Sequence, residues 1–176
     1  MPGLGTGSKS KNIALNLMQK LGVTMKEVSI KKEAMNQLKL LNHNMLEKDV
    51  TYENVQARIR TMYLMNLANL EKGIVLGTGD MSEIALGWST FNGDHMSMYN
   101  LNSGLPKTTI KALVKYFITI YPKVKNELKK VYNAVISPEL TGFDQATEDK
   151  IGKYQINDFI LYHIFMRGAS KERIIY

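Results

Sequence analysis

The chain has 176 residues and a formal net charge of +7 at neutral pH. Hydrophobic residues make up 44% and charged residues 22%, which is ordinary for a globular domain with a single core. No apolar run approaches the roughly 18 residues that a membrane span needs. Because the chain contains no cysteine, disulfides, thiolate metal sites and cysteine nucleophiles are excluded.

The excess of positive charge points to a polyanionic partner, either nucleic acid or a phosphorylated small molecule. Lysines outnumber acidic residues clearly in residues 1–40. A solvated helix face explains this pattern as well. The absence of cysteine is compatible with a reducing cytoplasm, which is the location that we expect.

Taken in order, the chain alternates between helical and strand-like patterns. Residues 1–8 have loop chemistry, a helix follows and ends at Leu21-Gly22, and residues 23–30 alternate as a strand does. Apolar residues at three- and four-residue spacing predict further helices. These are expected at residues 31–41, 49–70, 106–121, 124–134 and 156–167. Loop, helix and strand in this order are half of a βαβ unit, so we expect an α/β fold.

Residues 73–100 are the stretch around which the rest of the chain is organised. The stretch begins with a short apolar strand, which ends in the run Gly-Thr-Gly-Asp before a helical turn. In open α/β sheets, ligands bind where a strand ends and the next helix directs its N–H groups at them. Thr78, Asp80 and Glu83 therefore form a candidate ligand site. An ordinary turn capped by Ser82 gives the same pattern.

A second candidate is a polar row on the helix expected at residues 49–70. Asn54, Arg58 and Thr61 share one face of that helix, and a guanidinium can hold a phosphate or a carboxylate. A solvated helix face is the alternative. The histidines are scattered without metal-ligand spacing, and no Walker A loop or Gly-x-Gly-x-x-Gly fingerprint is present.

Three motifs resemble the synthetase domain of NAD synthetase, most closely the glutamine-dependent kind. They are TYENVQARIRT at residues 51–61, GTGDMSE at 77–83 and LGWSTFNGDHM at 86–96, with supporting matches at 1–6, 106–108 and 136–140. The resemblance covers nearly the whole chain. It implies a Rossmann-like adenine nucleotide alpha hydrolase fold, in which helices flank a parallel sheet.

The resemblance also implies a reaction. The family adenylates the nicotinate carboxylate of deamido-NAD with ATP and Mg²⁺, and ammonia then attacks the acyl adenylate to give NAD and AMP. Carried over to this chain, the deamido-NAD contacts are Asn54, Arg58, Glu83, Trp88, Ser89, Thr90 and Phe91. The ATP contacts are Thr78, Lys107 and Ser137, and Glu83 is the expected Mg²⁺ ligand. No side chain is assigned a direct catalytic role.

Several parts of the family pattern are missing: the pyrophosphate loop Ser-Gly-Gly-x-Asp-Ser, a basic C-terminal segment and the glutaminase domain that supplies ammonia. We therefore expect residues 1–176 to be a single partial NAD synthetase domain, truncated at both ends and inactive alone. The full-length enzyme is expected to be a homodimer or larger homo-oligomer without nucleic-acid or membrane partners. Two alternatives stay open: a nucleotide-binding or regulatory module without turnover, and a basic nucleic-acid-binding domain.

Overall fold

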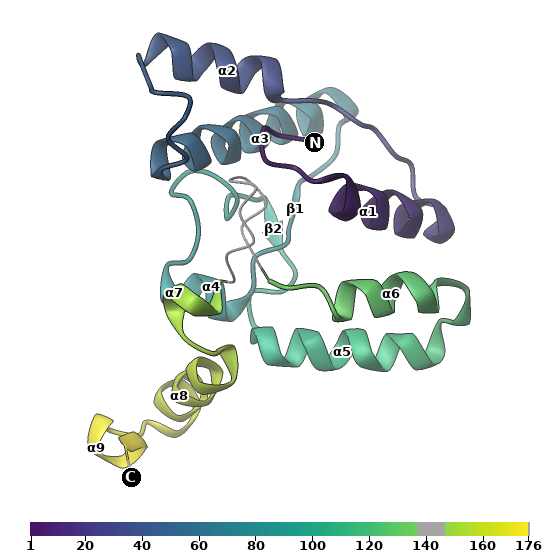
Figure 1. The fold of residues 1–176 in the computed structure, drawn as a ribbon. Helices are drawn as coiled ribbons and strands as arrows, with labels where there is room; N and C mark the ends of the chain where they lie inside the picture. Colours follow the sequence, from purple (N-terminus) through teal and green to yellow (C-terminus); the bar gives the residue numbers. More distant parts are fainter. Residues whose placement is uncertain (137–146, 176) are drawn as a thin grey trace.

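A small parallel sheet lies at the centre of the molecule. The structure is a computed structural model, and it describes residues 1–136 and 147–175. The sheet pairs β1 (Leu76–Gly77) with β2 (Tyr99–Asn100) in parallel. Figure 1 shows one pair of helices above this sheet and another pair below it, α2 (Lys31–Leu40) with α3 (Val50–Glu71) and α5 (Lys107–Ile120) with α6 (Lys125–Tyr132). The expectation of helices flanking a parallel sheet is thus confirmed.

Further helices complete the fold. They are α1 (Ser8–Leu21), α4 (Met81–Leu86), a 3-10 turn at Pro122–Val124, α7 (Glu148–Ile151), α8 (Tyr154–Arg167) and α9 (Lys171–Ile175). In Figure 1, α4, α7, α8 and α9 lie together toward the C-terminus, and α1 lies beside α6. Within the described ranges, no helix combines the length and the apolar character that crossing a membrane requires.

The strand predicted at residues 23–30 does not form. Ile30 donates its N–H to the carbonyl of Pro2 (3.0 Å), but no ladder continues from this bond in the part of the chain that the structure describes. Val23 and Met25, two apolar residues of the alternating pattern, are exposed. Alternation marks residues that could face a core, whereas a strand also needs a neighbour that supplies hydrogen bonds. The strand predicted at residues 74–76 does form, shifted to Leu76–Gly77.

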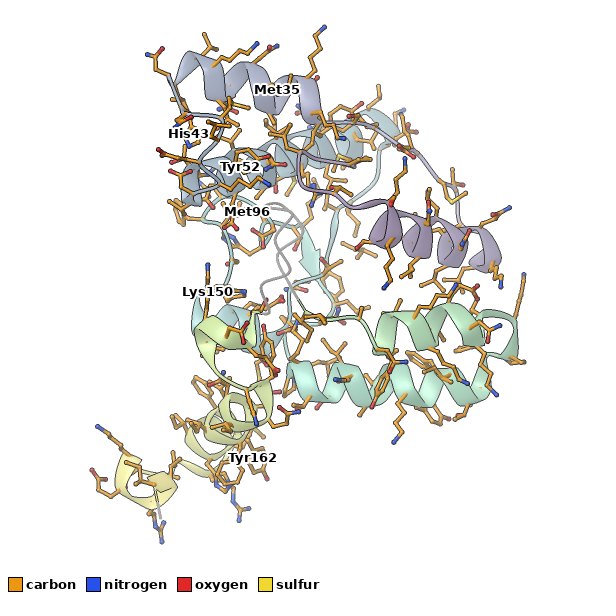
Figure 2. The ribbon with its side chains drawn as sticks, in the orientation of Figure 1. Met35, His43, Tyr52, Met96, Lys150 and Tyr162 are labelled. Carbon is orange, nitrogen blue, oxygen red and sulfur yellow. The ribbon has the colours of Figure 1, made fainter. Side chains whose placement is uncertain are left out.

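The main hydrophobic core lies between α2 and α3. Its members come from one face of each helix at three- and four-residue spacing: Ile30, Ala34 and Leu38 pack against Tyr52, Val55 and Ile59. Tyr52 lies in the α3 layer beneath α2, as Figure 2 shows. The carboxylate of Asp49 begins α3 by accepting the Tyr52 N–H (2.9 Å), so the first turn of the helix is capped where the core starts.

Replacing Leu38 by alanine should lower the free energy of unfolding by about 2–5 kcal/mol, because the change leaves a cavity in a packed core. Leu38 is 0% exposed. Leu40 lies on the same helix but is 83% exposed, so Leu40→Ala should change stability by less than about 0.5 kcal/mol. Urea denaturation followed by circular dichroism measures both variants. Similar losses in the two variants would contradict the assignment of the core to the Leu38 face.

Candidate functional site

Three side chains on α3 hold the loop that follows α4. The Asn54 amide oxygen accepts a hydrogen bond from the Thr90 hydroxyl (2.7 Å). The Arg58 guanidinium donates through Nε to the Phe91 carbonyl (3.1 Å). Thr61 donates its hydroxyl hydrogen to a carbonyl two residues further along the loop (2.6 Å). The polar row predicted from the sequence therefore anchors a loop, and the alternative of a purely solvated face is wrong.

The same loop is also held from within. The Thr90 N–H donates to the Asp94 carboxylate (2.8 Å), and His95 Nδ1 lies 2.8 Å from the Thr90 carbonyl. At the start of the loop, the Trp88 N–H donates to the Glu83 carbonyl (2.8 Å). The main chain of the loop is thus fixed at several points, and this fixes where its side chains lie.

Asp80 begins α4 with a capping box. Its Oδ1 accepts the Glu83 N–H (2.9 Å), and Glu83 Oε2 accepts the Asp80 N–H (3.3 Å). The cap is therefore Asp80, and the suggestion that Ser82 caps this helix is wrong. The Asp-x-x-Glu spacing is the sequence signal that identifies the capping residue.

The ammonium of Lys107, the first residue of α5, contacts both carboxylates of this box. Nζ lies 2.6 Å from Glu83 Oε1 and also forms an ion pair with Asp80 Oδ2. Asp80 is buried and Lys107 is largely buried. Burial opposes the charged form of Lys107, but its hydrogen bonds to Asp80 and Glu83 outweigh this effect and raise the pKa of Lys107. One cation thus neutralises two acids just beyond the end of β1.

A cavity of about 460 Å³ opens beside these acids. It is lined by residues from the end of β1, from α4 and from the following loop: Thr78, Gly79, Glu83, Ile84, Ser89, Asp94 and His95. Three predicted site residues therefore share one cavity. The sequence analysis did not single out Asp94 and His95, although both lie in the motif at residues 86–96.

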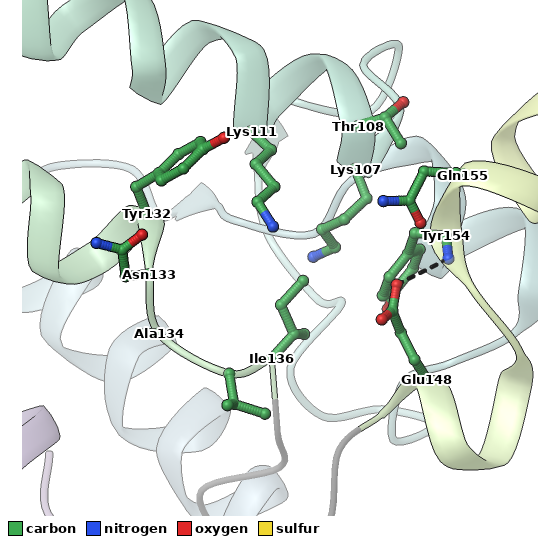
Figure 3. A pocket seen from close by; sticks show the side chains of 11 residues that line it. Lys107, Thr108, Lys111, Tyr132, Asn133, Ala134, Ile136, Glu148, Tyr154 and Gln155 are labelled. Atoms are coloured by element: carbon green, nitrogen blue, oxygen red, sulfur yellow. Dashed lines mark hydrogen bonds between the residues drawn. The ribbon is translucent and has the colours of Figure 1, made fainter.

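Lys107 lines a second cavity, of about 370 Å³, between α5, the segment after α6, and the start of α8. In Figure 3, Lys107 and Lys111 point into this space from α5, and Tyr154 and Glu148 lie across from them. Burial raises the pKa of Tyr154 to about 12, so its phenol is protonated at neutral pH. Its buried hydroxyl has no hydrogen-bond partner among the described residues. Two ammonium groups and a phenol donor suit an anionic ligand.

Of the two carboxylates, Glu83 is more accessible to a magnesium ion than Asp80, although the Lys107 ammonium and the Asp80 N–H already contact its two oxygens. No group of three or more histidine, aspartate and glutamate side chains in the described ranges is placed to hold a metal ion. A magnesium ion bound through substrate phosphates needs only one or two protein carboxylates. Glu83 lines the larger cavity and keeps a quarter of its side chain exposed. Asp80 is buried and occupied as a helix cap.

Three other predicted site residues, Ser137, Trp88 and Phe91, are not among the described residues that line either cavity. Ser137 lies outside the described residues. Trp88 and Phe91 lie in the anchored loop, but their side chains line neither of the two cavities described above. The Phe91 ring is exposed. Their positions relative to α3 and α4 are set through the main chain.

Comparison with known proteins assigns the family. The sequence model described as NAD synthase matches residues 1–176. The chain belongs to the NAD synthase family. Among its relatives, the glutamine-dependent NAD⁺ synthetase of Mycobacterium tuberculosis is 44% identical over 188 residues, a match that covers 100% of this chain and 28% of that protein. The chain thus spans about 28% of the length of these curated relatives.

Solved structures of NAD synthase relatives share the fold. NMN synthetase from Francisella tularensis matches with a TM-score of 0.77 and 27% identity, covering 98% of this chain and 68% of that one. A glutamine-dependent NAD⁺ synthetase from Acinetobacter baumannii, solved with ADP, matches with a TM-score of 0.67 and 27% identity, covering 99% of this chain and 31% of that one. The expected Rossmann-like adenine nucleotide alpha hydrolase fold is confirmed.

Replacing Lys107 by methionine should destabilise the protein by about 3 kcal/mol at neutral pH, because Asp80 is then left buried without a cation. The folded-state pKa of Lys107 is raised, so its contribution is fully present below pH 10.5 and is lost as pH rises through the higher folded value. The stability difference between the wild type and Lys107→Met should therefore be constant from about pH 6 to about pH 9 and shrink above pH 10.5.

Urea denaturation across this pH range measures that difference. Lys111→Met is the matched control, because Lys111 lies one turn further along α5 and has no carboxylate partner among the described residues. Lys111→Met should lower the free energy of unfolding little, and its difference from the wild type should not depend on pH. A difference that grows at alkaline pH would contradict the ion-pair assignment.

Proposed function

We propose that this chain is the central part of the synthetase domain of a glutamine-dependent NAD synthetase, which amidates deamido-NAD to NAD with ATP. The observation that carries the proposal is that Thr78 and Glu83 line one cavity while Lys107 forms an ion pair with Glu83, in a chain that matches the NAD synthase family along its whole length. The ADP complex of the Acinetobacter baumannii relative supports the use of an adenine nucleotide.

The ATP side of the site is built on Lys107. Lys107 lines the smaller cavity, and its ammonium contacts Glu83, which lines the larger one, so phosphate oxygens could join the carboxylates already around it. A fixed cation stabilises charge that develops on phosphates as pyrophosphate leaves. Thr78 offers a hydroxyl at the end of β1. Glu83 would hold Mg²⁺ together with those phosphates, and the ion would supply further charge neutralisation.

The deamido-NAD side is built on α3 and its anchored loop. Arg58 is exposed, and a guanidinium matches carboxylate or phosphate oxygens with paired donors. Asn54 and Arg58 hold Thr90 and Phe91 in place, and Ser89 faces the larger cavity. A loop fixed in this way can keep water away from an acyl adenylate, which hydrolyses readily.

We further propose that these 176 residues work within a longer protein. The chain spans only about 28% of its glutamine-dependent relatives, which supports a separate glutaminase domain as the source of ammonia. The Ser-Gly-Gly-x-Asp-Ser loop and the basic C-terminal segment would lie in the rest of the synthetase domain. The complete enzyme is expected to be a homodimer or larger homo-oligomer in the cytoplasm.

Amidation by the chain tests this proposal directly. With deamido-NAD, ATP, Mg²⁺ and ammonium, the chain alone should form no NAD, whereas adding an upstream fragment that carries the pyrophosphate loop should start turnover, measured by chromatography of NAD and AMP. Nicotinate mononucleotide belongs in the substrate panel, because one structural relative is an NMN synthetase. An inactive mixture that is shown to associate and fold would favour a nucleotide-binding module without turnover.

Arg58→Ala in the complete synthetase should raise the KM for deamido-NAD at least about tenfold, since a hydrogen bond to a charged group contributes roughly 1.5–3 kcal/mol. The KM for ATP should change little. Arg173→Ala is the matched control, because Arg173 is an exposed arginine on α9, away from α3. Steady-state kinetics with each substrate varied in turn measures both KM values. Equal increases in the two values would contradict a deamido-NAD contact.

A further inference from the structure

Three helices meet at one buried group of polar side chains beside Lys107. Ser82 comes from α4, Asp158 comes from α8, and the start of α5 supplies the N–H groups of Lys107 and Thr108. Ser82 is 0% exposed and Asp158 is 6% exposed. Contacts between residues so distant in sequence fix the three helices relative to one another.

Asp158 uses both of its carboxylate oxygens. Oδ1 accepts a hydrogen bond from the Ser82 hydroxyl, and Oδ2 accepts the Thr108 N–H (2.8 Å). The Ser82 oxygen in turn accepts the Lys107 N–H (2.9 Å). The first two N–H groups of α5 therefore donate hydrogen bonds to side chains of two other helices, Ser82 on α4 and Asp158 on α8.

These contacts replace a cap that α5 does not supply itself. The residue before the helix is Pro106, and no local side chain caps α5 in the described structure. The first N–H groups of a helix have no partner within the helix, so they need acceptors from elsewhere. Asp158 and Ser82 take the part that an N-cap side chain plays in other helices, and the negative charge of Asp158 lies at the positive end of α5.

We propose that Asp158 and Ser82 are the positioning residues of Lys107. Ser82 holds the backbone N–H of Lys107, while Glu83, the next residue on α4, holds its ammonium (2.6 Å). Both ends of Lys107 are therefore set by α4, and Asp158 ties this arrangement to α8. The proposal rests on the proposed function, in which Lys107 contacts ATP.

The test uses the complete synthetase that carries this chain. Asp158→Ala should raise the KM for ATP about 10- to 100-fold, because a small misplacement of a charge that contacts a substrate has effects of this size. The KM for deamido-NAD should change by less than about twofold, since the hydrogen bonds of Asn54 and Arg58 run to the loop after α4 and involve no residue of the group around Asp158.

Conservative and control variants separate positioning from general damage. Asp158→Asn keeps an acceptor for the Thr108 N–H and can donate to the Ser82 oxygen, so it should restore most of the lost ATP affinity. Asp149→Ala removes an exposed carboxylate on the neighbouring helix α7 and should leave both KM values unchanged. If Asp158→Ala does not fold, the KM values for ATP and deamido-NAD are compared in Ser82→Ala and Asp158→Asn instead.

Amide hydrogen exchange gives a readout that does not depend on activity. The amides of Lys107 and Thr108 should exchange faster in Asp158→Ala and Ser82→Ala than in the wild type, while amides in the α2–α3 core stay as they were. Unchanged exchange at these two amides, or equal increases in both KM values, would overturn the proposal. A wild-type enzyme that forms no NAD would instead refute the proposed function, and the exchange result would still decide whether the amides are anchored.

Discussion

The requirement that the buried Asp80 carboxylate be neutralised governs the middle of this molecule. A carboxylate that is 1% exposed is costly without a partner, so the ammonium of Lys107 must lie within reach of it. This ties the start of α4 to the start of α5. The capping box extends the tie to Glu83, which forms part of the cavity wall. The distances between the elements around the cavity thus follow from one charge pair.

The same constraint suits the chemistry that we propose. A lysine held by two carboxylates stays charged and stays in place before a nucleotide arrives. Phosphate oxygens then meet a cation that has already lost much of its hydration and side-chain freedom. An interaction prepared in this way stabilises developing charge with little rearrangement during the reaction. The loop anchored by α3 supplies the matching rigidity on the other side of the cavity.

Features that depend on neighbouring residues in the chain were predictable from the sequence. Helical periodicity located α2, α3, α5 and α8, and the run after β1 marked Thr78 and Glu83, which line one cavity. Features that depend on partners far away in the sequence were not predictable in this way. The face shared by Asn54 and Arg58 was evident, but the loop that it holds was not, and the strand at residues 23–30 was wrong because alternation does not show whether a neighbouring strand exists. Asp158 carries no local signal, since its partners lie on other helices.

The dependence of α5 on a carboxylate in α8 also sets an order for the formation of the site. Thr108 and Asp158 are 50 residues apart, so a ribosome releases Lys107 well before the group that anchors it. Closing that long stretch of chain costs conformational entropy, and this cost is offset only by the contacts that α8 makes when it docks. The bond between Thr108 and Asp158 can therefore form only after α8 has been made. Nascent chains that end before α8 would hold Lys107 through Asp80, Ser82 and Glu83 but would lack the contacts that Asp158 adds.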